Sequence, residues 1–214
     1  MGGNVQEQMK PPIMRVVQGG SQPALSSMQA KAILNDRISP EMRERGAKAI
    51  AGLERMLSED FTKQEQGFKR SLVMLKETIS GLLCGTAPDF RKYDREAISA
   101  LVSRNHDIKL SLSIEDGKPV LCPELESAIG TMLYMMNEYE TKRVGLLFGK
   151  ESDNEHQIII ISGASIKNFS RNVLPAVRSA VELAGCEFRP NGASVTMLVP
   201  LQPNSQTAGA PLPI

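Results

Sequence analysis

The sequence has no tryptophan, two histidines and three cysteines among its 214 residues. Because His106 and His156 are the only histidines, any mechanism that needs several imidazoles is excluded. Cys84, Cys122 and Cys186 are odd in number and lack the spacing of metal ligands, which indicates buried, reduced thiols. Reduced thiols are typical of the cytoplasm, so we expect a cytoplasmic protein.

An excess of one charge and long apolar runs are also lacking. The 25 basic and 24 acidic residues give a formal net charge of +1, so there is no global attraction to nucleic acid or to an anionic membrane. No apolar run reaches the roughly 18 residues of a membrane-spanning helix, and the first residues lack the apolar core of a signal peptide. Residues 108–114 and 156–161 lack the aromatics that stack on RNA bases. We therefore predict neither a membrane nor a nucleic-acid partner.

Residues 24–83 carry the apolar periodicity of two helices, with spacings of three, four and seven. Residues 58–60 fit a short turn between them, and Gly85 fits a C-terminal stop. One such hairpin leaves half of its apolar stripe exposed, so we predict a homodimer that pairs two hairpins into a four-helix bundle. The alternative is that the hairpin folds back onto its own C-terminal domain. The predicted dimer surface consists of Ile50, Leu53, Leu57, Phe68, Leu72, Leu75 and Ile79.

The second half of the chain alternates between extended and helical patterns. Strict alternation over residues 108–114 predicts a strand, and Asp116-Gly117 predicts a hairpin to a short returning strand at 118–121. The isoleucine run 158–161 predicts a central strand. The remaining predictions are helices at 94–103, 124–139 and 174–184, and strands at 143–148, 156–161 and 194–200, with a glycine turn and a short strand before the last.

The order of these elements resembles the sensor histidine kinase and histidine-phosphotransfer superfamily. The end of the chain is similar to that family's last helix, glycine turn and final strand, through residues 177–184, Gly185, Phe188, Asn191-Gly192 and 195–201. In those kinases a helical hairpin dimerises and carries the phosphoacceptor in Ser-His-Glu-Leu-Arg, which here is matched by Ser39-Pro40-Glu41-Met42-Arg43.

The resemblance implies an α+β fold in which a helical hairpin precedes a two-layer α/β sandwich with a mixed sheet. It divides the chain into a disordered arm (1–23), a dimerisation hairpin (24–85), an ATPase-like domain without a lid (86–201) and a disordered tail (202–214). A ferredoxin-like sandwich is the alternative, since residues 108–200 also read strand, helix, strand, strand, helix, strand. The order of strands in the sheet and the place of 118–121 would discriminate the two folds, and pairing of 118–121 with 108–114 would favour the kinase-like fold.

Departures from the family pattern affect every step of its chemistry. Pro40 stands at the phosphoacceptor position and has no nucleophilic nitrogen. Thr131 and Met135 stand where asparagines hold Mg²⁺ and phosphates, and Asn137 would match only by a shift of two residues. Ser162 replaces the aspartate that recognises adenine. Residues 166–173 contain no glycine and are too few for a lid. We therefore predict no catalytic, cofactor-binding or metal-binding residues and no cofactor.

Two features have simpler interpretations. Ser39-Pro40-Glu41 also fits an ordinary helix start, with Ser as the cap, Pro at the first helical position and an acid in the first turn. The basic residues Arg43, Arg45, Lys48 and Arg55 are interleaved with Glu41, Glu44 and Glu54, which is typical of a solvated helix face.

These observations predict a non-catalytic signalling adaptor or regulator, related to two-component histidine kinases and phosphotransfer proteins. It would act by protein binding as a homodimer, with a response regulator or a kinase as partner. One alternative is a structural or interaction domain of ferredoxin-like fold, unrelated to two-component signalling. An ATP-dependent kinase with an unusual site is the third hypothesis.

Overall fold

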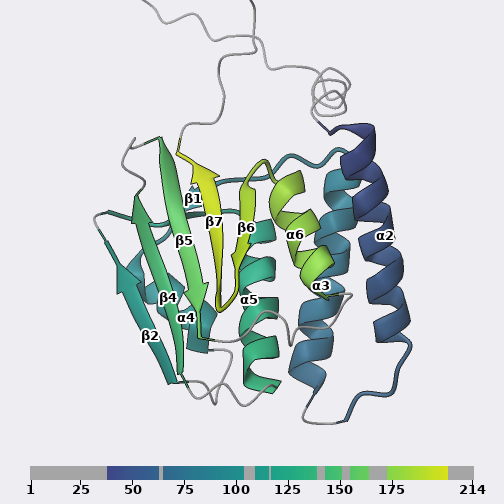
Figure 1. Cartoon of the computed structure of the whole chain (residues 1–214), viewed down its shortest axis with the longest axis horizontal. Helices are drawn as coiled ribbons and strands as arrows, with labels where there is room; N and C mark the ends of the chain where they lie inside the picture. The colour runs from purple at the N-terminus through teal and green to yellow at the C-terminus, as the bar shows by residue number, and fades with distance from the viewer. Residues whose placement is uncertain are drawn as a thin grey trace, which may run out of the picture.

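The computed structural model describes residues 38–62, 65–103, 109–115, 117–138, 143–150, 155–163 and 173–201. The expectations for the arm 1–23, for helix over 24–37 and for the tail 202–214 lie outside these residues. The described part combines a group of packed helices with a five-stranded sheet (Figure 1). None of its helices is long and apolar enough to cross a membrane.

The predicted hairpin is present as α2 (Pro40–Leu57) and α3 (Gln66–Leu83). Its connection is longer than the three-residue turn that the sequence predicts, and Phe61 lies in it rather than in a helix. The carboxylate of Glu65 accepts hydrogen bonds from the backbone N–H and the hydroxyl of Thr62, at 2.8 and 2.7 Å. In this contact a glutamate reaches back to the backbone N–H three residues before it, as in a capping box, and it marks the start of α3 after Phe61. Gly85 ends α3 with a φ of 89°, as predicted.

The α/β part follows in the predicted order. Its helices are α4 (Arg95–Ser103), α5 (Pro123–Glu138) and α6 (Val173–Leu183). Its strands are β1 (Arg91–Lys92), β2 (Lys109–Ile114), β3 (Val120–Leu121), β4 (Arg143–Lys150), β5 (His156–Ser162), β6 (Glu187–Asn191) and β7 (Ser194–Pro200). The main sheet has the order β2-β4-β5-β7-β6, so β5 is central as predicted. β2 and β4 run parallel and the other neighbours antiparallel, which makes the sheet mixed.

The predicted pairing of residues 118–121 with 108–114 is wrong. β3 instead pairs with β1, in a separate two-stranded ribbon. The buried side chain of Gln157 on β5 holds Val120 by accepting from its N–H at 2.7 Å and donating to its carbonyl at 2.9 Å. The Asp-Gly turn signal is local, whereas this contact from a distant strand decides where β3 lies.

The strand order separates the two predicted folds. In a split β-α-β unit of the ferredoxin-like kind, another strand lies between the two strands that a helix connects. Here β2 and β4, on either side of α5 in sequence, are direct parallel neighbours from Lys109 and Arg143 to Ile114 and Phe148. The ferredoxin-like alternative is therefore excluded, and the α+β fold with a mixed, kinase-like sheet is confirmed.

The four-helix packing that we expected between two chains is completed within one. α2 contacts α3 and α6, α3 contacts α5 and α6, and α5 contacts α6. Two glycines allow close approach: a Cβ at Gly46 would lie 3.2 Å from Leu83 Cδ1, and one at Gly67 would lie 2.9 Å from Tyr134 Cε1. Buried side chains from the hairpin and from the α/β part belong to one core cluster. The hairpin therefore folds back onto its own chain, which is the alternative that the sequence left open.

The two faces of the sheet differ in burial. Figure 1 shows α4 and α5 on the same side, behind the strands. Along β5 the burial alternates residue by residue, so that Ile159 and Ile161 are buried while Ile158 and Ile160 are half-buried. β4 repeats the pattern, with Leu146 buried and Leu147 half-buried. One face of the sheet therefore belongs to the core, and the other is less covered.

The cap of α2 gives a first prediction. Replacing Ser39 with alanine removes the acceptor for the backbone N–H of Met42 and is expected to lower the free energy of unfolding by about 1 kcal/mol. Ser39→Asp, which keeps an acceptor, is the matched control and should remain close to the unchanged protein. Urea denaturation measures both. Equal losses in the two variants would contradict the capping role.

Candidate functional site

The start of α2 carries Pro40, the residue that the sequence resemblance predicts at a phosphoacceptor position. The hydroxyl of Ser39 accepts a hydrogen bond from the backbone N–H of Met42 at 3.2 Å, Pro40 is the first helical residue, and Glu41 adds a carboxylate to the first turn. This arrangement confirms the interpretation of Ser39-Pro40-Glu41 as a helix start. The nitrogen of Pro40 belongs to the peptide bond and has no proton, so it cannot accept a phosphoryl group.

The face of α5 that the sequence resemblance predicts as the counterpart of a nucleotide site is covered by α3. Thr131 and Met135 are both buried, with exposed fractions of 0% and 2%. The hydroxyl of Thr131 is hydrogen-bonded to that of Ser71 on α3. One turn later on α5 and one turn earlier on α3, the ring of Tyr134 packs against Gly67. These positions are occupied by helix-to-helix packing, and the side chain of Asn137 lies outside the described residues.

The end of β5 carries Ser162, which the sequence resemblance predicts at the position of an adenine-recognising aspartate. Ser162 pairs with Gly145 and Ser194, and a Cβ at Gly145 would lie 2.6 Å from Ser162 Oγ. Since Ile161 belongs to the core, the alternation of a strand places the Ser162 side chain on the opposite, less covered face of the sheet. Gly163 follows with a φ of 119°, and α6 begins at Val173. Residues 164–172, which contain most of the segment that lacks lid glycines, lie outside the described residues.

The predicted dimer surface is largely interior in one chain. Leu53, Leu72, Leu75 and Ile79 have exposed fractions of 0%, whereas Ile50, Leu57 and Phe68 are half-buried against the same core. A dimer through the first four would require α2 and α3 to leave α5 and α6. The dimer itself stays a prediction.

The remaining candidates for chemistry are dispersed. His156 opens β5 opposite Pro200 and is half-buried, while His106, Glu151 and Asp153 lie outside the described residues. Within the described ranges, no three His, Cys, Asp or Glu side chains gather as a metal site would require.

The cysteines differ in exposure from the sequence-based expectation. Cys122 and Cys186 are buried as predicted, but Cys84 is exposed at the end of α3. Burial raises the pKa of the Cys122 thiol well above its ordinary value. Burial, with a contribution from nearby Glu124, raises the pKa of Cys186 from 9.0 to about 12. Both buried thiols therefore stay protonated at neutral pH and are poor nucleophiles.

Thiol labelling tests this difference. In the folded protein we expect Ellman's reagent to modify Cys84 alone, and all three cysteines after unfolding in guanidinium chloride. Because the folded-state pKa of Cys186 is raised, its contribution to stability is complete below pH 9.0 and is lost as the pH rises to about 12. Cys84→Ser should abolish labelling of the folded protein. Rapid labelling of this variant would contradict the burial of Cys122 and Cys186.

A groove between α2, α6 and β6 gathers basic side chains that the sequence did not bring together. Arg45, Lys48 and Arg55 come from α2 and Arg178 comes from α6. The floor is mostly apolar, and the groove has a volume of about 510 Å³. Its floor residues are Ala49, Gly52, Leu174, Pro175, Ser179, Phe188 and Pro190. The spacing of the basic residues on α2 is visible in the sequence and could have indicated a basic surface. Only the fold places Arg178 opposite them.

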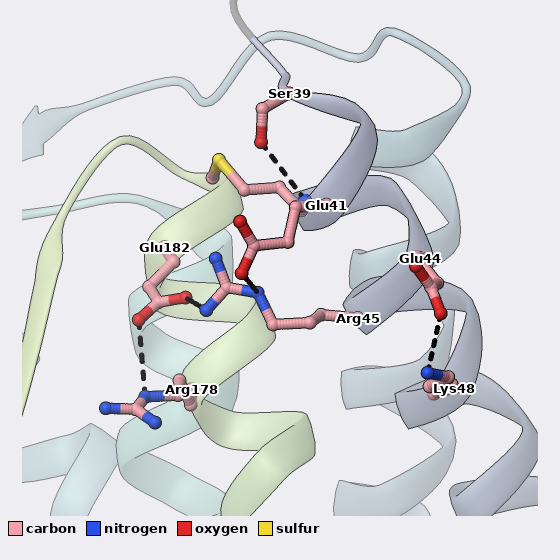
Figure 2. Close-up of polar contacts among 8 residues, drawn as sticks. Ser39, Glu41, Glu44, Arg45, Lys48, Arg178 and Glu182 are labelled. Atoms are coloured by element: carbon pink, nitrogen blue, oxygen red, sulfur yellow. Dashed lines mark hydrogen bonds and ion pairs between the residues drawn. The ribbon is translucent and has the colours of Figure 1, made fainter.

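Ion pairs organise one end of this groove (Figure 2). Glu182 on α6 binds Arg45 Nη1 at 2.9 Å and Arg178 Nε at 3.2 Å, so one carboxylate joins two guanidinium groups from different helices. Lys48 Nζ lies 2.6 Å from the carboxylate of Glu44, one turn earlier on α2. The guanidinium of Arg178 also lies 5.8 Å from the centre of the Phe188 ring. The face that the sequence assigned to solvent is thus partly a wall of the groove.

Comparison with known proteins finds similarity in structure only. No family model matches the sequence, and no curated protein matches it. The histidine kinase AdeS of Acinetobacter baumannii matches with a TM-score of 0.49 and 11% identity, over 78% of this chain and 100% of that chain. The blue-light activated histidine kinase EL346 of Erythrobacter litoralis matches with a TM-score of 0.44 and 14% identity, over 83% and 64%. The histidine kinase domain of the E. coli osmosensor EnvZ matches with a TM-score of 0.39 and 13% identity, over 58% and 95%.

At such low identity the matches concern the arrangement of helices and strands. The chain is similar in fold to histidine kinase domains.

Proposed function

We propose that this protein is a non-catalytic relative of histidine kinases and phosphotransfer proteins, and that it acts as an adaptor or regulator by binding other proteins. The observation that carries the proposal is the start of α2, where Pro40, which we assign to the phosphoacceptor position from the sequence resemblance, is the first helical residue. Ser39 and Glu41 complete a helix start there, so this position has a structural role that needs no imidazole.

The packing of α3 on α5 supports a function without ATP. A nucleotide at the family's site would need polar side chains of α5 to face its phosphates. In this chain Thr131 has its hydroxyl hydrogen-bonded to Ser71, and Met135 is buried in the core. Opening this face would expose apolar surface and leave a buried hydroxyl without its partner, and both changes cost free energy.

Two measurements test the absence of catalysis. The first mixes the purified chain with a phosphorylated histidine kinase and response regulator, with an ordinary histidine-phosphotransfer protein as the positive control. We expect no acid-labile label on this chain, and stable phosphohistidine on it would overturn the proposal. The second is calorimetry with ATP and Mg²⁺, in which saturable binding would favour the third hypothesis, an ATP-dependent kinase.

The partners and the oligomeric state belong to the same proposal. We propose a homodimer that binds a response regulator or a kinase. Because four of the seven predicted interface residues are interior, the half-buried Ile50, Leu57 and Phe68 are the members of that set that remain near the surface. Light scattering across a concentration series should give twice the 23.4 kDa chain mass, and a monomer throughout would refute the dimer.

A further inference from the structure

The groove between α2, α6 and β6 combines an apolar floor with a basic rim. Leu174 and Pro175 from α6 and Phe188 and Pro190 from β6 contribute most of the apolar lining. On the α2 side, the lining includes Ala49 and Gly52, whose small size leaves room for the groove. A concave apolar surface of this size accepts a few side chains of a ligand or partner.

The rim is cationic on both sides. Arg45, Lys48 and Arg55 lie along α2, Arg178 lies across on α6, and the lining includes no acidic residue. The side chains of Arg45, Lys48 and Arg178 are 43%, 74% and 46% exposed. Glu182 shows that two of these guanidinium groups are spaced to share one carboxylate. An arriving acidic side chain would therefore meet arginines that Glu182 already holds in position, and it would share them with Glu182 as it would share Lys48 with Glu44.

We propose that this groove is the docking site for an acidic segment of a partner protein, in which apolar side chains alternate with carboxylates. The apolar side chains would cover Phe188, Leu174 and the prolines, while the carboxylates would pair with Arg55, Lys48 and Arg178. A small inorganic anion fits less well, because the cations are exposed at the rim and the only buried side-chain donor in the lining is the hydroxyl of Ser179. This inference rests on the proposed function as a binding protein and gives the partner's chemistry and place.

The test uses the full chain and a short fluorescent peptide of alternating glutamate and leucine. Saturable binding is expected at low ionic strength, and it should weaken as salt is added. The same peptide with glutamine in place of glutamate should bind much more weakly. Arg55→Glu and Arg178→Gln are expected to weaken binding of the acidic peptide by about tenfold each. The matched control is Arg70→Glu, an exposed position on α3 outside the groove, which should change the affinity by less than about twofold.

Three outcomes would overturn the inference. They are an absence of saturable binding, an equal loss of affinity in the Arg70→Glu variant, and tighter binding of pyrophosphate or of a single-stranded oligonucleotide than of the peptide. Circular dichroism of each variant confirms that it is folded. Because the phosphotransfer and ATP measurements do not involve this groove, catalysis could be detected while the peptide still binds, and the two proposals can fail separately.

Discussion

Replacing Leu75 with alanine is expected to lower the free energy of unfolding by about 2–5 kcal/mol. Leu75 on α3 has no exposed surface and belongs to the cluster that joins the hairpin to the α/β part. Truncation removes the transfer free energy of its side chain and leaves a cavity between packed helices. A loss of this size is expected because other helices of the same chain bury Leu75. If the hairpin stood apart from the α/β part, its apolar stripe would be largely exposed in a single chain.

Met74→Ala is the matched control, because Met74 is the neighbouring residue on α3 and is 53% exposed. Its truncation should change the free energy of unfolding by no more than about 0.5 kcal/mol. Urea denaturation, followed at two protein concentrations by circular dichroism, measures both variants. A small loss for Leu75→Ala, or a separate early transition for the hairpin, would contradict the single core and favour the two-unit division into 24–85 and 86–201.

Leu146→Ala and Leu147→Ala are expected to differ strongly, although the two leucines are adjacent in β4. Leu146 is 1% exposed on the face of the sheet that belongs to the core, and its truncation should cost about 2–5 kcal/mol. Leu147 pairs with Ile160 on the other, half-buried face and should cost less than about half as much, because less apolar surface is lost from contact.

The comparison is sharp because both changes remove the same atoms from the same strand. Thermal and urea denaturation of the two variants give the difference directly. Equal losses would contradict the assignment of the two faces. If the loss in Leu147→Ala appears only at high protein concentration, a second copy of the chain covers the outer face.

Local sequence signals predicted most of the elements. β7 spans residues 194–200 as predicted, and α5 and α6 differ from their predicted bounds by one residue at each end. Helix periodicity, Gly85 after α3 and the cap at Ser39 act over a few residues, so their outcome depends little on the rest of the chain. The connection before α3 is longer than predicted because the contact between Thr62 and Glu65, which is of the capping-box kind, places the start of α3 after Phe61.

Which strand or helix each element packs against could not be predicted in the same way. The Asp-Gly signal suggested a neighbour for β3 that Gln157, a residue of a distant strand, prevents by binding Val120. Arg178 joins Arg45 and Arg55 in one groove only because α6 packs on α2. Such contacts depend on which apolar faces of different helices and strands pack together. The periodicity of a single segment predicts its own structure but not the element that it packs against.

The sequence by itself determined which chemical groups are present. Pro40 offers no nucleophilic nitrogen and Ser162 no carboxylate, whatever the fold. It also determined that the hairpin has an apolar stripe that must be buried. Only the tertiary structure decided what buries it: α5 and α6 of the same chain complete the four-helix packing. The physical reason is that hydrophobic burial is non-directional, so a stripe needs an apolar surface of matching shape, and two glycines on the hairpin allow that surface to come from its own domain.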